Sequence, residues 1–265
     1  MKFKQSLLAA SLAAALSAPA HAALLTSFVG MSVFGDTDGT PGGATCPLCD
    51  STVSFAVWEN ESGNWLNDSF FANAGTAVAL APFSTGVDTA ARYVYLYQVN
   101  NTDPLAPPEQ ELENFNITWI SPPTSGGYLD TTTFSALSGA VTPLDVPNDH
   151  SPSLLTSVGN LIAGSGLVNA DSLERNVISS PAVQNGTLAA EAMLFSWNAN
   201  NRIQPGNASS VVFLTSDQAP RYTWAETESP GGFGTAGDVP SAVPVPATLS
   251  LLAIGLVGMR RARRG

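Results

Sequence analysis

The only two cysteines of the chain, Cys46 and Cys49, are separated by two residues, which is the spacing of a redox dithiol or of half a zinc site. A structural zinc ion needs four ligands, and His150 is the only other soft ligand in the central region. A thioredoxin-like dithiol would stand beside a βαβ unit, which the surrounding sequence does not predict. Because the two ends of the chain, described below, indicate export to an oxidising compartment, we predict a structural disulfide without a metal ion.

Two groups of acidic residues have a spacing that could serve chemistry. Asp36 and Asp38, followed by Gly39, resemble the start of a calcium loop, because alternate carboxylates before a glycine suit a tight turn around a hard cation. No distal Glu follows, so an acidic turn is the main interpretation and calcium is the alternative. Glu226 and Glu228 could in principle cleave a glycosidic bond, but among 21 acidic residues some close pairs arise by chance.

Two further patterns carry no predicted catalytic role. Residues 232–237 match the dinucleotide-binding fingerprint, but no buried strand precedes them and no amphipathic helix follows, so we interpret them as part of a flexible linker. His150 stands between Asp149 and Ser151 in a proline-flanked turn, and the chain has no G-x-S-x-G motif. We therefore predict that the protein is not an enzyme and has no cofactor.

Five tryptophans could bind a ligand by stacking. Large aromatic side chains provide platforms for sugar rings when they are exposed, but they fill a hydrophobic core equally often. Exposure of Trp58, Trp65 and Trp224 would therefore favour a carbohydrate-binding module, and their burial would not. The five residues are Trp58, Trp65, Trp119, Trp197 and Trp224.

The charge of the central region excludes one class of partner. All 21 acidic residues lie between Asp36 and Asp238, where only four basic residues occur, so this region has a formal charge of −17. Such a surface repels phosphate backbones and anionic headgroups, and we predict no binding to nucleic acid. The four basic residues are Arg92, Arg175, Arg202 and Arg221.

The body that must position these residues is predicted to consist of short strands. Residues 92–99 alternate most clearly, with Tyr93, Tyr95 and Tyr97 on one face and Val94 and Leu96 on the other. Frequent turn residues between apolar runs favour an antiparallel β-sandwich or jelly roll, with one short helix at most, in 154–168. Further predicted strands are 24–34, 52–58, 76–80, 115–120, 188–197, 209–215 and 221–225, the last two joined by a hairpin or sharp return at 217–220.

The N-terminal 22 residues have the three parts of a secretory signal peptide. Lys2 and Lys4 provide the positive region, and residues 7–16 form an apolar stretch that is too short to span a bilayer. Residues 20–22 then read Ala-His-Ala, a small-x-small cleavage site. We expect the mature protein to begin at Ala23.

The C-terminal 23 residues have three parts as well. Pro244, Val245 and Pro246 precede an apolar run at 247–259, and an arginine-rich end follows, with Arg260, Arg261, Arg263 and Arg264. As a helix, the 13-residue run spans about 20 Å against a bilayer core of about 30 Å, a gap that thinning and long arginine side chains can narrow. The positive-inside tendency keeps the arginines cytoplasmic, so the body faces the periplasm or the exterior.

This order of motif, short helix and arginines resembles the PEP-CTERM sorting signal that exosortases recognise. The resemblance is confined to the C-terminal segment, and Val245 stands where the family usually has Glu. It implies an exosortase-like sorting enzyme as partner, cleavage near Pro244 and Pro246, and transfer to the cell surface or the extracellular polymer.

These observations predict four regions: a signal peptide (1–22), a β-rich extracytoplasmic domain (23–228), a Gly/Pro-rich spacer (229–242) and a sorting and anchor segment (243–265). The predicted function is that of an exported, surface-sorted, non-catalytic protein of the envelope or extracellular polymeric matrix. The alternatives are a carbohydrate-binding β-sandwich module, with extracellular polysaccharide as partner, and a glycan-processing enzyme.

Overall fold

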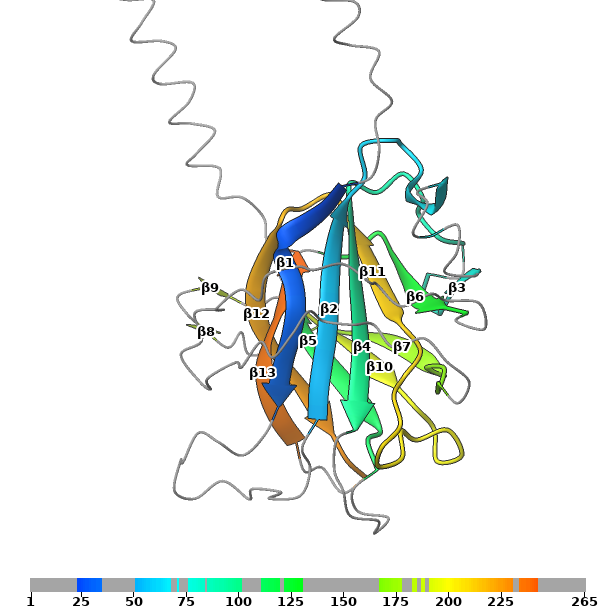
Figure 1. Ribbon diagram of the computed structural model, residues 1–265, viewed down its shortest axis with the longest axis vertical. Helices are drawn as coiled ribbons and strands as arrows, with labels where there is room; N and C mark the ends of the chain where they lie inside the picture. The colour runs from blue at the N-terminus through cyan, green and yellow to red at the C-terminus, as the bar shows by residue number, and fades with distance from the viewer. Residues whose placement is uncertain are drawn as a thin grey trace, which may run out of the picture.

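The computed structural model describes residues 23–34, 51–67, 71, 76–83, 85–101, 111–119, 122–130, 167–177, 183–184, 187–188, 191–230 and 234–242. Most of these residues lie in strands, and all strand pairs among them are antiparallel. Two large sheets contain nearly all of the strands (Figure 1). The predicted mainly antiparallel β fold with two sheets is therefore confirmed.

The first large sheet has six strands in the order β1-β2-β4-β11-β6-β3. Its long members run side by side at the front of Figure 1. The strands are β1 (Ala23–Phe34), β2 (Ser51–Glu59), β4 (Tyr93–Asn101), β11 (Val212–Ser216), β6 (Ser125–Leu129) and β3 (Ala77–Ala79).

The second large sheet lies behind the first in Figure 1 and has five strands in the order β13-β12-β5-β10-β7. A two-stranded ribbon, β8-β9, lies outside both sheets. The five strands are β13 (Gly234–Ala242), β12 (Pro220–Glu228), β5 (Asn114–Trp119), β10 (Glu191–Ser196) and β7 (Ser172–Val177), and the ribbon is β8 (Val183–Gln184) with β9 (Thr187–Leu188).

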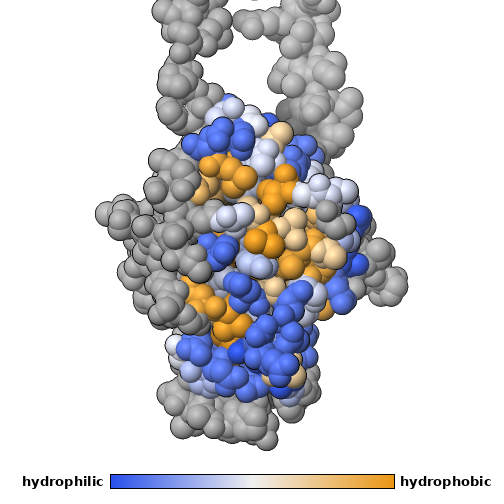
Figure 2. Space-filling model, turned by 90° about the vertical axis from the view of Figure 1, so that its right-hand side faces the viewer, coloured by the Kyte–Doolittle hydropathy of each residue, from blue (hydrophilic) through white to orange (hydrophobic). Residues whose placement is uncertain are grey.

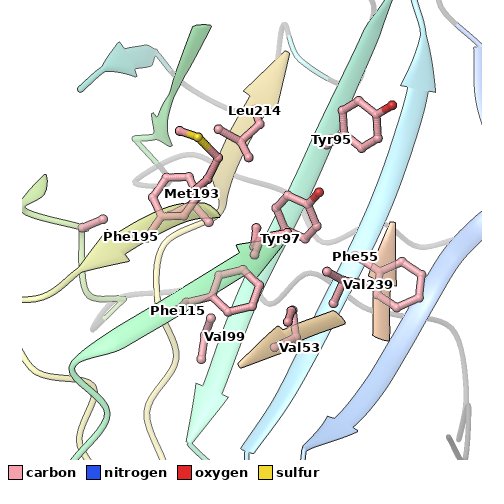
Figure 3. Packing of buried hydrophobic residues seen from close by; sticks show 14 of the residues in the cluster. Val53, Phe55, Tyr95, Tyr97, Val99, Phe115, Met193, Phe195, Leu214 and Val239 are labelled. Atoms are coloured by element: carbon pink, nitrogen blue, oxygen red, sulfur yellow. The ribbon is translucent and has the colours of Figure 1, made fainter. Parts of the chain in front are cut away.

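The main core lies between the two large sheets. Because side chains alternate across a strand, one face of each sheet points into this space. Figure 3 shows Tyr97 and Val99 of β4 pointing toward Phe115 of β5, with Val239 of β13 nearby. The predicted common face of Tyr93, Tyr95 and Tyr97 is confirmed, since all three belong to this core.

A second core covers the opposite face of the six-stranded sheet. Val94 and Leu96 of β4 belong to it, so every residue of β4 is buried, whichever face it points to. The cover comes from the segment between β2 and β4, which contains the 3-10 helix η1 (Trp65–Asn67) and Phe71. The Trp65 ring lies 4.7 Å from the Phe71 ring and 5.7 Å from the Phe213 ring, measured between centroids.

One side of the sandwich, at the right of Figure 1, carries β3 and β6. Figure 2 shows hydrophobic residues exposed there among hydrophilic ones. Leu80, Phe83 and Tyr128 are only partly buried and pack against the main core.

β6 was not predicted, because its Gly126-Gly127 pair is typical of a turn. A Cβ atom at Gly127 would lie 1.8 Å from the Val78 carbonyl oxygen, so the close approach of β3 to β6 requires glycine here.

The eight predicted strands are all present, with ends shifted by a few residues. β11 and β12 belong to different sheets, so residues 217–219 make the predicted sharp return and not a hairpin. β7 is an edge strand that was not predicted, because Glu174 and Arg175 interrupt the apolar pattern of a strand. Charged residues are common on edge strands. The helix predicted in 154–168 falls largely outside the described residues.

The predicted spacer at 229–242 is wrong over most of its length. Residues 234–242 form β13, which pairs with all nine residues of β12. Val239 and Ala242 are completely buried in the main core, and the Tyr97 hydroxyl donates a hydrogen bond to the Pro240 carbonyl. The reason is that small residues let β13 pack closely against β1: a Cβ atom at Gly237 would lie 2.5 Å from the Phe34 ring. Gly237, which in the sequence resembles a linker glycine, is required here for close packing against Phe34.

Candidate functional site

Most of the predicted site residues lie outside the part of the chain that the structure describes. These are the calcium candidates Asp36 and Asp38, the predicted disulfide Cys46–Cys49, the turn with His150, the motif Pro244, Val245 and Pro246, and the tail Arg260, Arg261, Arg263 and Arg264. The predicted signal peptide 1–22 also lies outside it. These assignments stay predictions.

The tryptophans are described, and four of them fill the cores. Trp65, Trp119 and Trp197 are completely buried, and Trp58 is 3% exposed. The Trp65 indole N–H donates to the Asp88 carbonyl at 2.9 Å, which ties η1 to the following loop. Trp58 and Trp65 therefore serve packing and cannot act as open stacking platforms, whereas Trp224 of β12 is only partly buried.

Sheet register defines a polar surface on the five-stranded sheet. Residues directly opposite each other in an antiparallel pair project to the same face. Phe115, Ile117 and Trp119 of β5 point into the main core, so Asn114 and Asn116 project outward. The cross-strand pairing then places outward the side chains of Glu226 and Glu228 on β12, Leu194 and Ser196 on β10, Ser172 and Glu174 on β7, and Trp224 beside them.

We call this surface the outer acidic face and define it by Asn114, Asn116, Glu174, Leu194, Trp224, Glu226 and Glu228. Glu226, Asn116, Leu194 and Glu174 are consecutive cross-strand partners and form one row. Three strand spacings of about 4.8 Å give this row a length of roughly 14 Å. Residues from four strands, distant in sequence, thus meet on one surface.

The polar groups of this face are mostly hydrogen-bond acceptors. The Asn114 side-chain amide donates to the Glu228 carboxylate at 3.0 Å. The side-chain oxygen of Asn116, the cross-strand partner of Glu226, is buried and accepts no hydrogen bond. The accessible polar groups here are the two carboxylates of Glu226 and Glu228, which are hydrogen-bond acceptors.

Two arginines, Arg175 of β7 and Arg221 of β12, are exposed on strands of the same sheet. Two of the four arginines are paired elsewhere. The Arg92 guanidinium lies 2.8 Å from Glu59, and the Arg202 guanidinium lies 3.2 Å from Glu111 and 2.7 Å from Glu113.

Burial, and secondly the charge of Glu228, raise the pKa of the Glu226 carboxyl above its ordinary value. A carboxyl that is more easily protonated in the folded state stabilises the fold most below its unfolded pKa of about 4.3. This contribution is lost as the pH rises through the folded-state pKa.

We expect the parent protein to lose stability between about pH 4 and about pH 7 as Glu226 ionises, and Glu226→Gln to reduce this loss. The reduction should be less than about 1 kcal/mol, because the carboxyl group is partly solvated. Urea unfolding of the parent and the variant at both pH values measures the difference. Glu226→Asp keeps the charge and serves as the control. An unchanged pH dependence in the glutamine variant would show that another group causes the loss.

Glu226 and Glu228, the acidic pair considered for cleavage of a glycosidic bond, are two residues apart on β12, roughly 7 Å between Cα atoms. Both side chains project from the same sheet face.

Among the described residues, no group of three His, Cys, Asp or Glu side chains is placed to hold a metal ion. A membrane-spanning helix is likewise not found within the described ranges. No known protein family, curated protein or solved structure matches this chain. The class that the structure defines is a two-sheet antiparallel β protein with an acidic, acceptor-rich sheet face.

The sequence analysis named two members of this face, Glu226 and Glu228, as an acidic pair. It also named Trp224 as a residue whose exposure would favour carbohydrate binding. It missed Asn114, Asn116 and Glu174. The alternation of polar and apolar residues in 114–119 was the available signal for the two asparagines. Glu174 gave no such signal, because only the pairing of β7 with β10 places it on this surface.

Proposed function

We propose that this is an exported, non-catalytic protein that an exosortase-like enzyme sorts to the cell surface or the extracellular polymeric matrix. The observation that carries the proposal is the order of Pro244, Val245 and Pro246, a short apolar run and four terminal arginines. The predicted signal peptide at the other end supports export. The C-terminal helix anchors the chain in the inner membrane until sorting.

The position of β13 supports this assignment of parts. The last of the described strands, β13, ends at Ala242, two residues before Pro244, so it directly precedes the predicted sorting segment. A sandwich that includes β13 and ends here remains whole if the chain is cut at the motif. The connections between strands are also consistent with a jelly-roll-like sandwich, since β4, β5, β6 and β7 alternate between the two sheets.

The alternative function is a carbohydrate-binding module. The observation that favours it is the outer acidic face, which combines a partly exposed tryptophan with carboxylates and amides. The two functions are compatible, because a matrix protein needs a surface that contacts the polymer.

Removal of residues 243–265 should release the protein in soluble form into the periplasm or the medium. The reason is that the predicted anchor is lost while the last strand is kept. Cell fractionation of the full and truncated chains, in a bacterium that contains an exosortase, measures this. A chain without residues 2–22 should stay in the cytoplasm and is the control for export. If the truncated chain sediments with membranes as the full chain does, the anchor lies elsewhere and the proposal fails.

A further inference from the structure

The first described strand begins at one end of the sandwich, the upper end in Figure 1. β1 starts at Ala23, the predicted first mature residue, and Ala23 is opposite Glu59 of β2. Glu59 is in turn opposite Tyr93, the first residue of β4. Three neighbouring strands therefore have these residues at the same end, which we call the terminal end and define by Ala23, Glu59 and Tyr93.

The last described strand ends at the terminal end as well. Ala242, the last residue of β13, is opposite Pro220, the first residue of β12. Only residues 217–219 separate Pro220 from Ser216 of β11, and Ser216 is opposite Tyr93. Two strands from opposite ends of the sequence, β1 and β13, are thus connected to the preceding and following segments at one end of the sandwich.

The last residues of β13 are held firmly in the body. Ala242 and Ser241 are completely buried. The Thr223 hydroxyl donates to the Ser241 hydroxyl at 2.8 Å, and the Pro240 carbonyl accepts a hydrogen bond from buried Tyr97. Detachment of these residues would expose core surface to water, so the strand does not lengthen the connection to the segment that follows.

The connection from β13 to the predicted anchor is short. Four residues, 243–246, lie between Ala242 and the apolar run at 247–259. The five Cα–Cα steps that join strand and run cover at most about 18 Å, because an extended chain covers no more than about 3.6 Å per residue. The sandwich is longer than this, since β4 alone covers about 26 Å from Tyr93 to Asn101. The body therefore cannot invert and turn its far end toward the bilayer.

We propose that this short connection holds the terminal end toward the inner membrane while the protein is anchored, with the lipid headgroups as its neighbour. The inference rests on the proposed function, which supplies the anchor. The predicted signal peptide supports the same orientation before its removal, because it joins the body at Ala23.

The two ends of the sandwich then have different neighbours. At the terminal end, the sorting enzyme reaches Pro244 and Pro246 in the space between body and bilayer. At the opposite end, beside the last residue of β4, Arg202 binds Glu111 and Glu113. This opposite end is the surface that the anchored protein presents to molecules outside the membrane.

Charge does not determine this orientation. Exposed Arg92 and Arg221 lie at the terminal end, but exposed Glu61 and Asp217 lie there too. Attraction of the arginines to anionic headgroups is opposed by repulsion of the carboxylates. The orientation should therefore persist at high salt, where the screening length falls from about 10 Å at 0.1 M to about 3 Å at 1 M.

The test compares two labelled variants of the full mature chain in vesicles of phosphatidylethanolamine and phosphatidylglycerol. Both carry Cys46→Ser and Cys49→Ser, so that a single introduced thiol takes the fluorescent label. Glu61→Cys places the label after β2 at the terminal end, and Asn207→Cys places it in a turn at the opposite end; both positions are exposed. Quenching by lipids with a nitroxide on the headgroup measures how close each label is to the bilayer.

The label at Glu61 should be quenched at least about threefold more strongly than the label at Asn207, because the two ends are about 26 Å apart. The ratio should be the same at about 1 M salt. Insertion of about 30 Gly and Ser residues after Ala242 should make the two labels about equally quenched, since such a linker has an end-to-end distance of about 30 Å. Thermal unfolding verifies that each variant is folded.

Equal quenching of the two labels in vesicle-bound protein without the insertion would overturn the inference and leave the proposed sorting function standing. A difference that disappears at high salt would assign the orientation to charge, and a difference that survives the insertion would assign it to direct lipid binding. Both results would overturn the role of the short connection. Failure of the full chain to bind the vesicles would overturn this inference together with the proposed anchor.

Discussion

Removal of residues 231–265 should abolish cooperative unfolding, whereas removal of residues 243–265 should leave it in place. The first deletion takes away β13, and the second ends the chain after Ala242, the last residue of that strand. Both deletions remove the predicted anchor, so the difference between them reports on residues 231–242 alone. Far-ultraviolet circular dichroism during urea and thermal unfolding measures it.

The size of the expected effect follows from what β13 contacts. Burial of Val239 contributes about 1.5–3 kcal/mol, and the loss of the Pro240 carbonyl leaves the buried Tyr97 hydroxyl unpaired at a cost of about 1–3 kcal/mol. The nine cross-strand pairs with β12 and the contacts with β1 are lost in addition. Domains are stable by only about 5–15 kcal/mol, so the remaining chain should not fold cooperatively. Similar unfolding of the two truncated chains would show that residues 231–242 are a dispensable spacer.

Trp65→Ala should destabilise the protein by about 3–5 kcal/mol without a specific effect on ligand binding. Trp65 is completely buried in the second core, where its ring contacts Phe71 and Phe213. Its indole N–H also donates to the Asp88 carbonyl, which would lose its partner. Chemical denaturation measures the loss of free energy of unfolding.

Trp224→Ala is the matched control, because it removes the same side chain from a partly exposed position. It should cost less stability than Trp65→Ala and should act mainly on binding to the outer acidic face. If Trp65→Ala were well tolerated, the second core would contribute little to the fold, and the segment between β2 and β4 would be a dispensable cover.

The structure also changes how the acidic composition is understood. A charge of −17 over the central region predicts only repulsion of anions. The sheet register shows where part of this charge lies, because it places Glu174, Glu226 and Glu228 on one face.

The strands themselves could be predicted because the signal is local. In 52–58 and 92–99 the alternation of side chains has the period of a strand, and both segments became central strands, β2 and β4. The two ends of the chain also depend only on local composition, and their assignment as signal peptide and sorting segment comes from sequence alone. Hydrophobic run length and flanking charge decide such predictions without any knowledge of the fold.

The tertiary structure decided everything that depends on pairing between distant segments. Alternation defines the two faces of a strand but does not show what covers each face. Both faces of β4 are buried, and Trp65 belongs to the core that covers one of them. Glycine and proline at 234–242 looked like a linker because their short-range preferences oppose a strand, but close packing against Phe34 and pairing with β12 outweigh those preferences. Asn116, Leu194 and Glu226 are neighbours only through hydrogen bonds between strands that are far apart in sequence. The outer acidic face could therefore be recognised only once the register was known.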